Sequence, residues 1–369
     1  MRITNGILIN NSLSNINSNK TTMDKLNTQL TSQKKIQRPS DDPIVAIRAL
    51  RFRSTLSEIS QYLDKNIPDA TSWMETTDEA LGDVVGILGD ITEYCNQAVN
   101  GNYDTTDKNT ILETLKAYRD QIYSDANADC AGRTIFTGYK TDGTLTFTSN
   151  STKTYKITQK FDSSALDTTL KVANGLDVSG INDTTIGSTV ISSLKLPTQV
   201  SAYRLRLGYD ELDSTSGVEI KLNESGDTIT TTTKNSSDSG VYEPGDDEAY
   251  FLADTGELIL GKNVYAKMSS AAVDSKGESI SVTYTKTGFD KGELDPSQYF
   301  DCVDQTDADS SKWVSYTSKN QEINYEINFN QSIKINTQGK DVFTQDMTRD
   351  LDDIINVVNY ALNVENNKT

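Results

Sequence analysis

The sequence predicts an α+β protein: an elongated, coiled-coil-like helical rod built from the N- and C-terminal segments, with an inserted antiparallel β-rich region. Apolar residues recur at steps of three and four near both ends of the chain, which is the spacing of helices that pack in bundles. The middle is rich in Thr, Ser, Asp and Gly with short alternating apolar runs, as in strands joined by turns. We expect an N-terminal assembly helix and turn in residues 1–42, a helical rod domain in 43–135 and 341–369, and one or two inserted β domains in 136–340.

The composition excludes several classes of protein. The 369 residues carry a net charge of -18, which argues against nucleic acid as a partner because its phosphates must be neutralised by Lys and Arg. No apolar run approaches the ~20 residues of a membrane-spanning helix, so we expect no membrane partner. The first residues lack the apolar core and cleavage site of a secretory signal peptide. Residues 1–60 depart from the acidic character, with nine Lys or Arg against four Asp or Glu.

We expect no catalytic residue, no metal site and no cofactor. The chain has no histidine, which removes the commonest general base and metal ligand. Its three cysteines form no CxxC motif, and we expect Cys95 and Cys130 to be small buried residues on helices. The acidic clusters at 246–248 and 304–309 match no calcium loop and are expected to be solvated turns.

Residues 4–33 are expected to form a helix with a narrow apolar stripe, which we call the assembly seam. Its members follow steps of three, seven, three and four: Leu13, Ile16, Met23, Leu26 and Leu30. Most other positions are polar, and many are Asn, Ser or Thr, which are weak helix formers. Alone, such a helix has too little apolar surface to offset the cost of ordering it. It therefore needs a partner helix, from its own chain or from a neighbouring subunit.

A turn follows this helix at Arg38, Pro39, Ser40, Asp41, Asp42 and Pro43. Both prolines remove a backbone donor and push the preceding residue out of the helical region. The residues between them are N-cap types, and Pro43 fits the first position of a new helix. A capped turn explains the stretch; the alternative is that Arg38 and the two aspartates reach a neighbouring subunit.

The rod is expected to begin with a long helix from Pro43 to Val99, which Pro68 should kink or divide in two. A third helix, capped by Thr105 or Thr106, should fold back antiparallel and end near Gly132 as its C-cap. The helical pattern returns at Asp341 and should join the same rod. The expected rod core is Leu56, Ile59, Leu63, Met74, Leu81, Leu88, Ile91, Leu115, Ile122, Leu351, Ile354 and Val358.

Alternating apolar runs predict strands in the middle of the chain, at 154–157, 203–207, 279–284 and 323–329. The runs at 249–252 and 257–260 flank Asp254-Thr255-Gly256, which predicts a hairpin with a short turn.

Taken together, these segments resemble the N-terminal half of the bacterial flagellin superfamily. The resemblance rests on the order of Arg38-Pro39-Ser40-Asp41-Asp42-Pro43, Thr77-Asp78-Glu79-Ala80-Leu81, Asn100-Gly101 and the run from Ala126 to Gly138, and it covers about residues 1–147. The Pro-Ser-Asp-Asp-Pro turn and the Gly-Arg-Thr-Ile-Phe-Thr-Gly run are similar to the superfamily members that join hook and filament. Flagellins themselves usually carry Ala-x-Asp-Asp and Phe-Asn-Gly there.

The resemblance implies a non-enzymatic structural subunit of the flagellum, located outside the cell and exported by the type III route without a cleaved signal peptide. It would link the hook to the flagellin filament by helical self-assembly, with the hook-side junction protein, flagellin and other copies of itself as partners. The alternative within the superfamily is a filament subunit. The alternative from another class is an extracellular binding or enzymatic module in residues 148–340.

The end of the chain departs from the family pattern. Members normally continue into a further helix that returns along the rod and packs on the N-terminal helix, and this sequence ends at Thr369 without it. We interpret the sequence as truncated or partial. The resemblance therefore does not extend to the export chaperone, which uses that C-terminal end.

Overall fold

The computed structural model describes residues 5–36, 38–40, 42–99, 104–172, 199–222, 226–271, 273 and 277–366. Contacts divide the chain into two units, residues 1–71 with 325–333 and residues 72–324 with 334–369. The assignment of 1–42, of 43–135 with 341–369, and of 136–340 to separate domains stays a prediction.

The first unit consists of helices and one hairpin. Its helices are α1 (Asn5–Ser32), α2 (Pro43–Gln61), the π-helical turn η1 (Tyr62–Asn66) and the start of α3 (Ile67–Val99). Gln33 has a φ of 55° directly after α1, so the helix ends slightly earlier than expected. Asp42 caps α2 as predicted, accepting a hydrogen bond from the backbone N–H of Val45 at 3.2 Å, and Pro43 opens the helix.

The π-helical turn lies directly before Pro68. The backbone N–H of Ile67 donates to the carbonyl of Tyr62, five residues earlier and not four. Proline cannot donate, and its ring crowds the carbonyl four residues before it. A wider turn at this point is the usual response of a helix to such a block. The expectation that Pro68 interrupts the rod is confirmed, with a π-helical turn as the form of the interruption.

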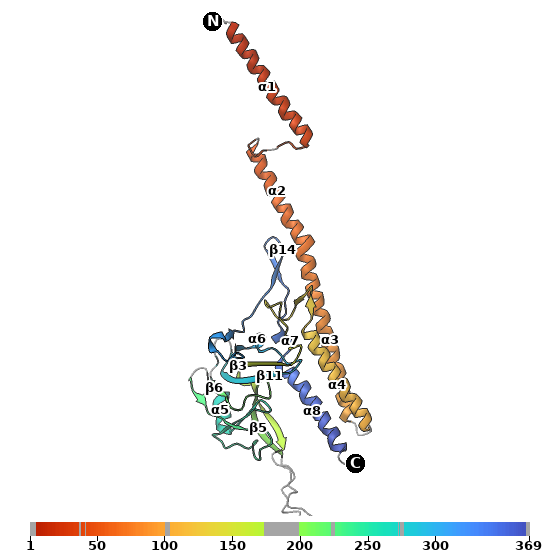
Figure 1. Ribbon diagram of the computed structural model, residues 1–369, viewed down its shortest axis with the longest axis vertical. Helices are drawn as coiled ribbons and strands as arrows, with labels where there is room; N and C mark the ends of the chain where they lie inside the picture. Colours follow the sequence, from red (N-terminus) through yellow and green to blue (C-terminus); the bar gives the residue numbers. More distant parts are fainter. Residues whose placement is uncertain are drawn as a thin grey trace, which may run out of the picture. The chain divides into compact units, whose positions relative to one another are not determined.

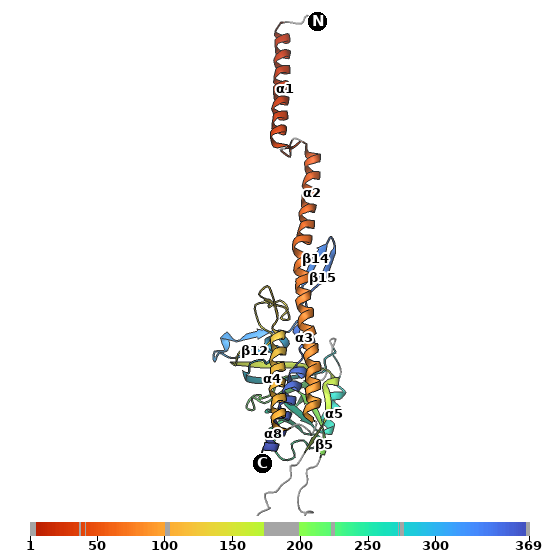
Figure 2. The same ribbon diagram turned by 90° about the vertical axis from the view of Figure 1, so that its right-hand side faces the viewer.

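The helices of the second unit are α3, α4 (Thr105–Ala126), α7 (Gly339–Val342) and α8 (Gln345–Asn366), with the short α5 (Lys262–Ser269) and α6 (Pro296–Tyr299) in the β region. Helix α4 lies along α3 and α8 lies along α4 (Figures 1 and 2). The hydroxyl of Tyr118 donates to Asp90 at 3.1 Å across α3 and α4, and Arg119 pairs with Asp352 at 2.9 Å across α4 and α8. Helical segments from both ends of the chain thus pack together, as predicted.

Several predicted helix boundaries are wrong. Asp104, not Thr105 or Thr106, caps α4, because its carboxylate accepts from the backbone N–H of Asp107 at 2.9 Å. The C-cap of α4 is Asn127. Gly132 has a φ of 76° in the turn between β1 (Asp129–Cys130) and β2 (Arg133–Thr134), so it serves a tight hairpin. The C-terminal pattern is split into α7 and α8 and does not run continuously from Asp341.

The inserted region contains two larger sheets, both largely antiparallel. The five-stranded sheet has the order β4 (Leu166–Val172), β5 (Gln199–Arg206), β10 (Glu257–Leu260), β9 (Ala249–Leu252) and β8 (Thr232–Lys234), and β8 pairs parallel to β9. The six-stranded sheet has the order β13 (Val314–Tyr316), β12 (Asp301–Asp304), β3 (Ser151–Phe161), β11 (Ile280–Phe289), β6 (Glu219–Leu222) and β7 (Thr228–Ile229). The predicted hairpin is confirmed, with Leu258 opposite Phe251 in β10 and β9.

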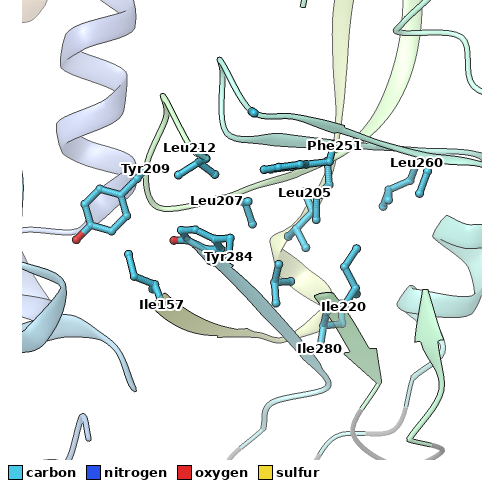
Figure 3. Close-up of a cluster of buried hydrophobic side chains, with 14 of the residues drawn as sticks. Ile157, Leu205, Leu207, Tyr209, Leu212, Ile220, Phe251, Leu260, Ile280 and Tyr284 are labelled. Carbon is cyan, nitrogen blue, oxygen red and sulfur yellow. The ribbon is translucent and has the colours of Figure 1, made fainter. Parts of the chain in front are cut away.

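One apolar core joins the two sheets (Figure 3). In β11, buried side chains alternate with half-buried ones from Ile280 to Tyr284, which is the period of a strand with one buried face. They meet Leu205 and Phe251 of the other sheet, both 0% exposed. Residues of the five-stranded sheet also line a smaller cluster on its other face, among them Tyr250 and Ile259. The two sheets therefore form one β domain.

The predicted rod core is buried only in part among the described residues. Ile91, Leu115, Ile122 and Leu351 are at most 5% exposed, and Leu81, Leu88, Ile354 and Val358 are half-buried. Leu56, Ile59, Leu63 and Met74 are instead 64, 45, 63 and 36% exposed. Their spacing identifies a stripe along the helices correctly, but the described part of the chain supplies nothing that covers it.

Candidate assembly surface

The assembly seam on α1 is fully open. Its five side chains are 52 to 79% exposed, and no residue of α1 is buried. The helix is further weakened by side chains that hydrogen-bond to the carbonyl four residues back, for example Thr21 to Asn17 at 2.9 Å and Ser32 to Thr28 at 2.7 Å. Such bonds compete with the helical backbone. Within the described residues, α1 gains no burial to balance the cost of ordering it.

The turn after α1 is also at the surface. Arg38, Pro39 and Ser40 are exposed, while Asp42 and Pro43 form the cap of α2. Asp41 lies outside the described residues. The side-chain amide of Gln29 donates to the carbonyl of Lys35 at 2.7 Å, which ties the end of α1 to the turn. Capping explains Asp42 and Pro43; a contact of Arg38 with another subunit stays a prediction.

Helix α2 carries more exposed apolar surface than the sequence analysis assigned to it. Ile44, Ile47, Leu50 and Phe52 are 57 to 76% exposed, although none was among the predicted site residues. The signal was present: Phe52 precedes Leu56, Ile59 and Leu63 at steps of four, three and four. Apolar patches of this extent are rare on soluble monomers and usually mark contacts with other molecules. The candidate surface therefore extends from α1 over all of α2.

The hairpin of β14 (Asn324–Asn328) and β15 (Gln331–Lys334) packs against the helix at the π-helical turn, as both views show (Figures 1 and 2). The side-chain amide of Asn66 donates to the carbonyl of Glu326 at 2.7 Å. The hydroxyl of Tyr325 donates to Asp69, and the ring of Phe329 meets that of Tyr62 edge-on at 5.8 Å. The helices of the first unit are therefore exposed as far as Gln61, and from Tyr62 onward the β14–β15 hairpin supports them.

Charged side chains, as well as apolar ones, hold the helices of the second unit together. Burial raises the pKa of Asp352, and the neighbouring Arg119 partly offsets that rise. Arg349 of α8 donates to the backbone carbonyls of Leu207, which directly follows β5, and of Thr255, which lies shortly before β10. Burial lowers the pKa of the Arg349 guanidinium. These bonds hold α8 to the β domain as well as to α4.

Among the described residues, no group of three or more His, Cys, Asp or Glu is placed to hold a metal ion. Burial raises the pKa of Cys302 to about 12, so its thiol stays protonated and unreactive at neutral pH. Cys130 is buried as expected, but on β1 and not on a helix, and Cys95 is half-buried on α3. Of the described helices, none is long and apolar enough to span a membrane.

Comparison with known proteins finds a similarity in the part of the chain that contains the open helices. Residues 3–141 match the bacterial flagellin N-terminal helical region. The flagellar hook-associated protein 3 of Salmonella typhimurium is 31% identical over 144 residues, which are 38% of this chain and 45% of the relative. A flagellin of Bacillus subtilis is 32% identical over 149 residues, 39% of this chain and 46% of the relative. The chain thus spans about half the length of these relatives.

Among solved structures, a crystal structure of FlgL from Xanthomonas campestris gives a TM-score of 0.27 at 15% identity, covering 64% of this chain and 75% of that one. A TM-score this low does not bear on the fold. The sequence matches do confirm the resemblance that the motifs predict: residues 3–141, with the assembly seam, the turn, α2, α3 and α4, are similar to the bacterial flagellin N-terminal helical region.

Proposed function

We propose that this protein is a non-enzymatic structural subunit of the bacterial flagellum, placed at the junction between hook and filament. The observation that carries the proposal is the open apolar surface of α1 and α2, which falls within the part of the chain matched to flagellins. Two relatives are named flagellar hook-associated protein 3, which favours the junction over the filament. The partners would be further copies of this chain, the hook-side junction protein and flagellin.

The assembly seam suits a subunit that travels unfolded and folds at its destination. Most of α1 is polar, and its stripe is narrow, so the segment alone is marginally stable and easily unfolded. Burial of the five seam side chains against a neighbouring subunit would supply about 1.5–3 kcal/mol for each large apolar residue. The subunit would thus reach an extracellular site through the flagellar type III export channel without a cleaved signal peptide and become ordered on assembly.

The test replaces Leu26 and Leu30 together with Asp in the chromosomal gene of the source bacterium. Charges in the seam prevent burial because an ionised carboxylate is costly to desolvate, so filaments should detach and motility should be lost. The matched control is Asn11→Asp with Ser18→Asp, which adds the same two charges to the exposed opposite side of α1 and should leave attachment normal. Normal filament attachment in the Leu26→Asp, Leu30→Asp strain would refute the proposal.

A filament subunit is the second candidate, because the flagellin of Bacillus subtilis matches to a similar extent. Abundance in sheared flagella separates the two. A junction subunit would be a trace band beside flagellin, whereas a filament subunit would be the main band.

A further inference from the structure

The outer face of the six-stranded sheet carries a group of polar side chains that the proposed assembly surface does not use. In β11, Thr283 and Thr285 alternate with buried residues, so their side chains project from the face opposite the core. Lys156 of β3 lies directly across from Thr285, and Glu219 of β6 lies directly across from Thr283. Residues paired in this way share one face of a sheet. The sheet thus brings two hydroxyls, an ammonium and a carboxylate together on its surface.

These four residues line a hollow of about 290 Å³. Residues 216–218, which precede β6, form one wall, and Gln305, which follows β12, forms the other. Backbone hydrogen bonds fix both walls: the N–H of Asp213, just before the first wall, donates to the carbonyl of Thr285 at 2.9 Å, and the N–H of Gln305 donates to that of Thr154 at 2.8 Å. The hollow is therefore formed by the sheet itself and needs no ligand to shape it.

Much of the hydrogen-bonding capacity at the hollow is unused. Within the part of the chain that the structure describes, the side chains of Lys156, Thr285 and Gln305 have no hydrogen bond or ion pair. Thr283 shares one hydrogen bond with Thr158 at 3.0 Å, and Glu219 pairs with Lys221 at 2.8 Å. A hydroxyl and a carboxylate each keep further acceptor sites after one such bond. The hollow can therefore offer several donors and acceptors to one ligand.

The side chains at the hollow indicate the chemical class of that ligand. Val218 and Tyr284, the apolar residues at its edge, pack in the core of the β domain, so a hydrophobic ligand would find no apolar side chain there. A phosphate group would meet the carboxylate of Glu219 as well as the ammonium of Lys156, and the repulsion offsets the attraction.

A sugar ring fits both the groups and the volume. Its hydroxyls donate and accept, as do the hydroxyl and amide side chains of the hollow. Small-molecule pockets typically have volumes of about 300–1,000 Å³, and the 290 Å³ of this hollow lie at the lower end of that range. The hollow therefore suits a ligand of one or two rings.

We propose that this hollow binds a pyranose sugar, either free or as the end unit of a glycan. Thr283, Thr285 and Gln305 would exchange hydrogen bonds with the sugar hydroxyls. Lys156 would donate to a sugar oxygen, and Glu219 would accept from a hydroxyl. The inference goes beyond the proposed function, because it assigns a ligand to the β domain and does not involve α1 or α2.

Saturation-transfer NMR on the full chain tests the site. The probes are glucose, galactose, mannose and N-acetylglucosamine, each at millimolar concentration as the free sugar and as the methyl glycoside. At least one probe should receive magnetisation from the protein. Thr283→Val with Thr285→Val removes both hydroxyls but keeps the β-branched shape that strands favour, and it should weaken binding of that probe about tenfold.

Two further variants control for folding and for position. Lys156→Ala changes an exposed residue and should also weaken binding with the fold intact. Thr154→Val with Thr287→Val removes a second pair of threonines, which bond to each other at 3.1 Å on the same face of the sheet but do not line the hollow. This control should bind the probe as the wild type does.

The outcomes separate the inference from the proposed function. Transfer to no probe, or transfer that Lys156→Ala and the Thr283→Val, Thr285→Val variant leave unchanged, would overturn the inference. An equal loss in the control variant would also overturn it, because binding would then not depend on the hollow. A larger signal from the methyl glycosides supports a glycan end as the ligand, and a larger signal from the free sugars supports a monosaccharide. Filament attachment is not measured here, so the proposed function is tested separately.

Discussion

Leu26 and Leu205 show how differently the two units of this chain use the same residue type. Leu26 belongs to the assembly seam of α1 and is 58% exposed, whereas Leu205 is 0% exposed between the two sheets of the β domain. In the second unit, apolar residues from distant parts of the sequence bury one another. In the first unit, α1 and α2 contain no buried residue among those described. The second unit has the core of a folded domain; the first has helices whose apolar stripes face outward.

The difference in burial between the two units determines how much of the cost of ordering each one recovers. Fixing the backbone costs about 1–2 kcal/mol per residue, and the 28 residues of α1 recover little of it through burial. The β domain recovers the same cost from a shared apolar core. Within the described residues, the first unit therefore lacks the burial that would balance the cost of its order, and the second has it.

The largest expected difference comes from matched Leu→Ala substitutions in the two units. Leu205→Ala should lower the free energy of unfolding of the second unit by about 2–5 kcal/mol, since it opens a cavity in a packed core. Leu26→Ala should change it by less than about 0.5 kcal/mol, as is usual for exposed sites. Urea unfolding followed by the fluorescence of Trp73, which is buried in α3, measures both. Equal effects of the two substitutions would mean that the units are not energetically distinct.

A smaller loss of stability is expected from removing the hydrogen bonds between the β14–β15 hairpin and the helix of the first unit. Asn66→Ala removes the bond to the carbonyl of Glu326, and Tyr325→Phe removes the bond to Asp69. Each should cost about 0.5–1.5 kcal/mol, the net contribution of a typical hydrogen bond. The backbone amides between Tyr62 and Asp69 should exchange hydrogen faster, by the factor that this loss of free energy implies. The matched control Gln61→Ala, an exposed residue of α2, should leave those rates unchanged.

The smallest effect concerns pH in the second unit. Burial raises the pKa of Glu293 above its usual 4.5, and Lys286 at 3.2 Å partly offsets that rise. Because the folded state holds this proton more tightly, the contribution of Glu293 to stability increases as the pH falls from neutral toward 4.5. The free energy of unfolding of the wild type, relative to Glu293→Gln, should therefore rise over that range. A difference that stays constant or falls between pH 7 and pH 5 in urea unfolding would contradict the assignment.

Local signals in the sequence were sufficient for much of the fold. Spacing predicted α1, α2 and α4, the residue types around Pro43 predicted the cap on Asp42, and Asp254-Thr255-Gly256 predicted the β9–β10 hairpin. Burial was less predictable, because a stripe such as that of Leu56 and Leu63 shows only which side of a helix is apolar. It does not show which segment, if any, covers that side.

Contacts between distant residues account for most of what was missed. The pair of Tyr62 and Phe329 joins segments more than 260 residues apart, and no local pattern near either residue indicates the other.

Hydrogen exchange of the chain, free and within isolated flagella, tests the central claim most directly. The claim is that α1 and α2 become stably ordered and buried on assembly into the flagellum. Amides in residues 5–61 should exchange rapidly in the free chain and become protected in the flagellar junction, while those of the β domain are protected in both. Equal protection of residues 5–61 in the two states, whether high or low, would contradict it.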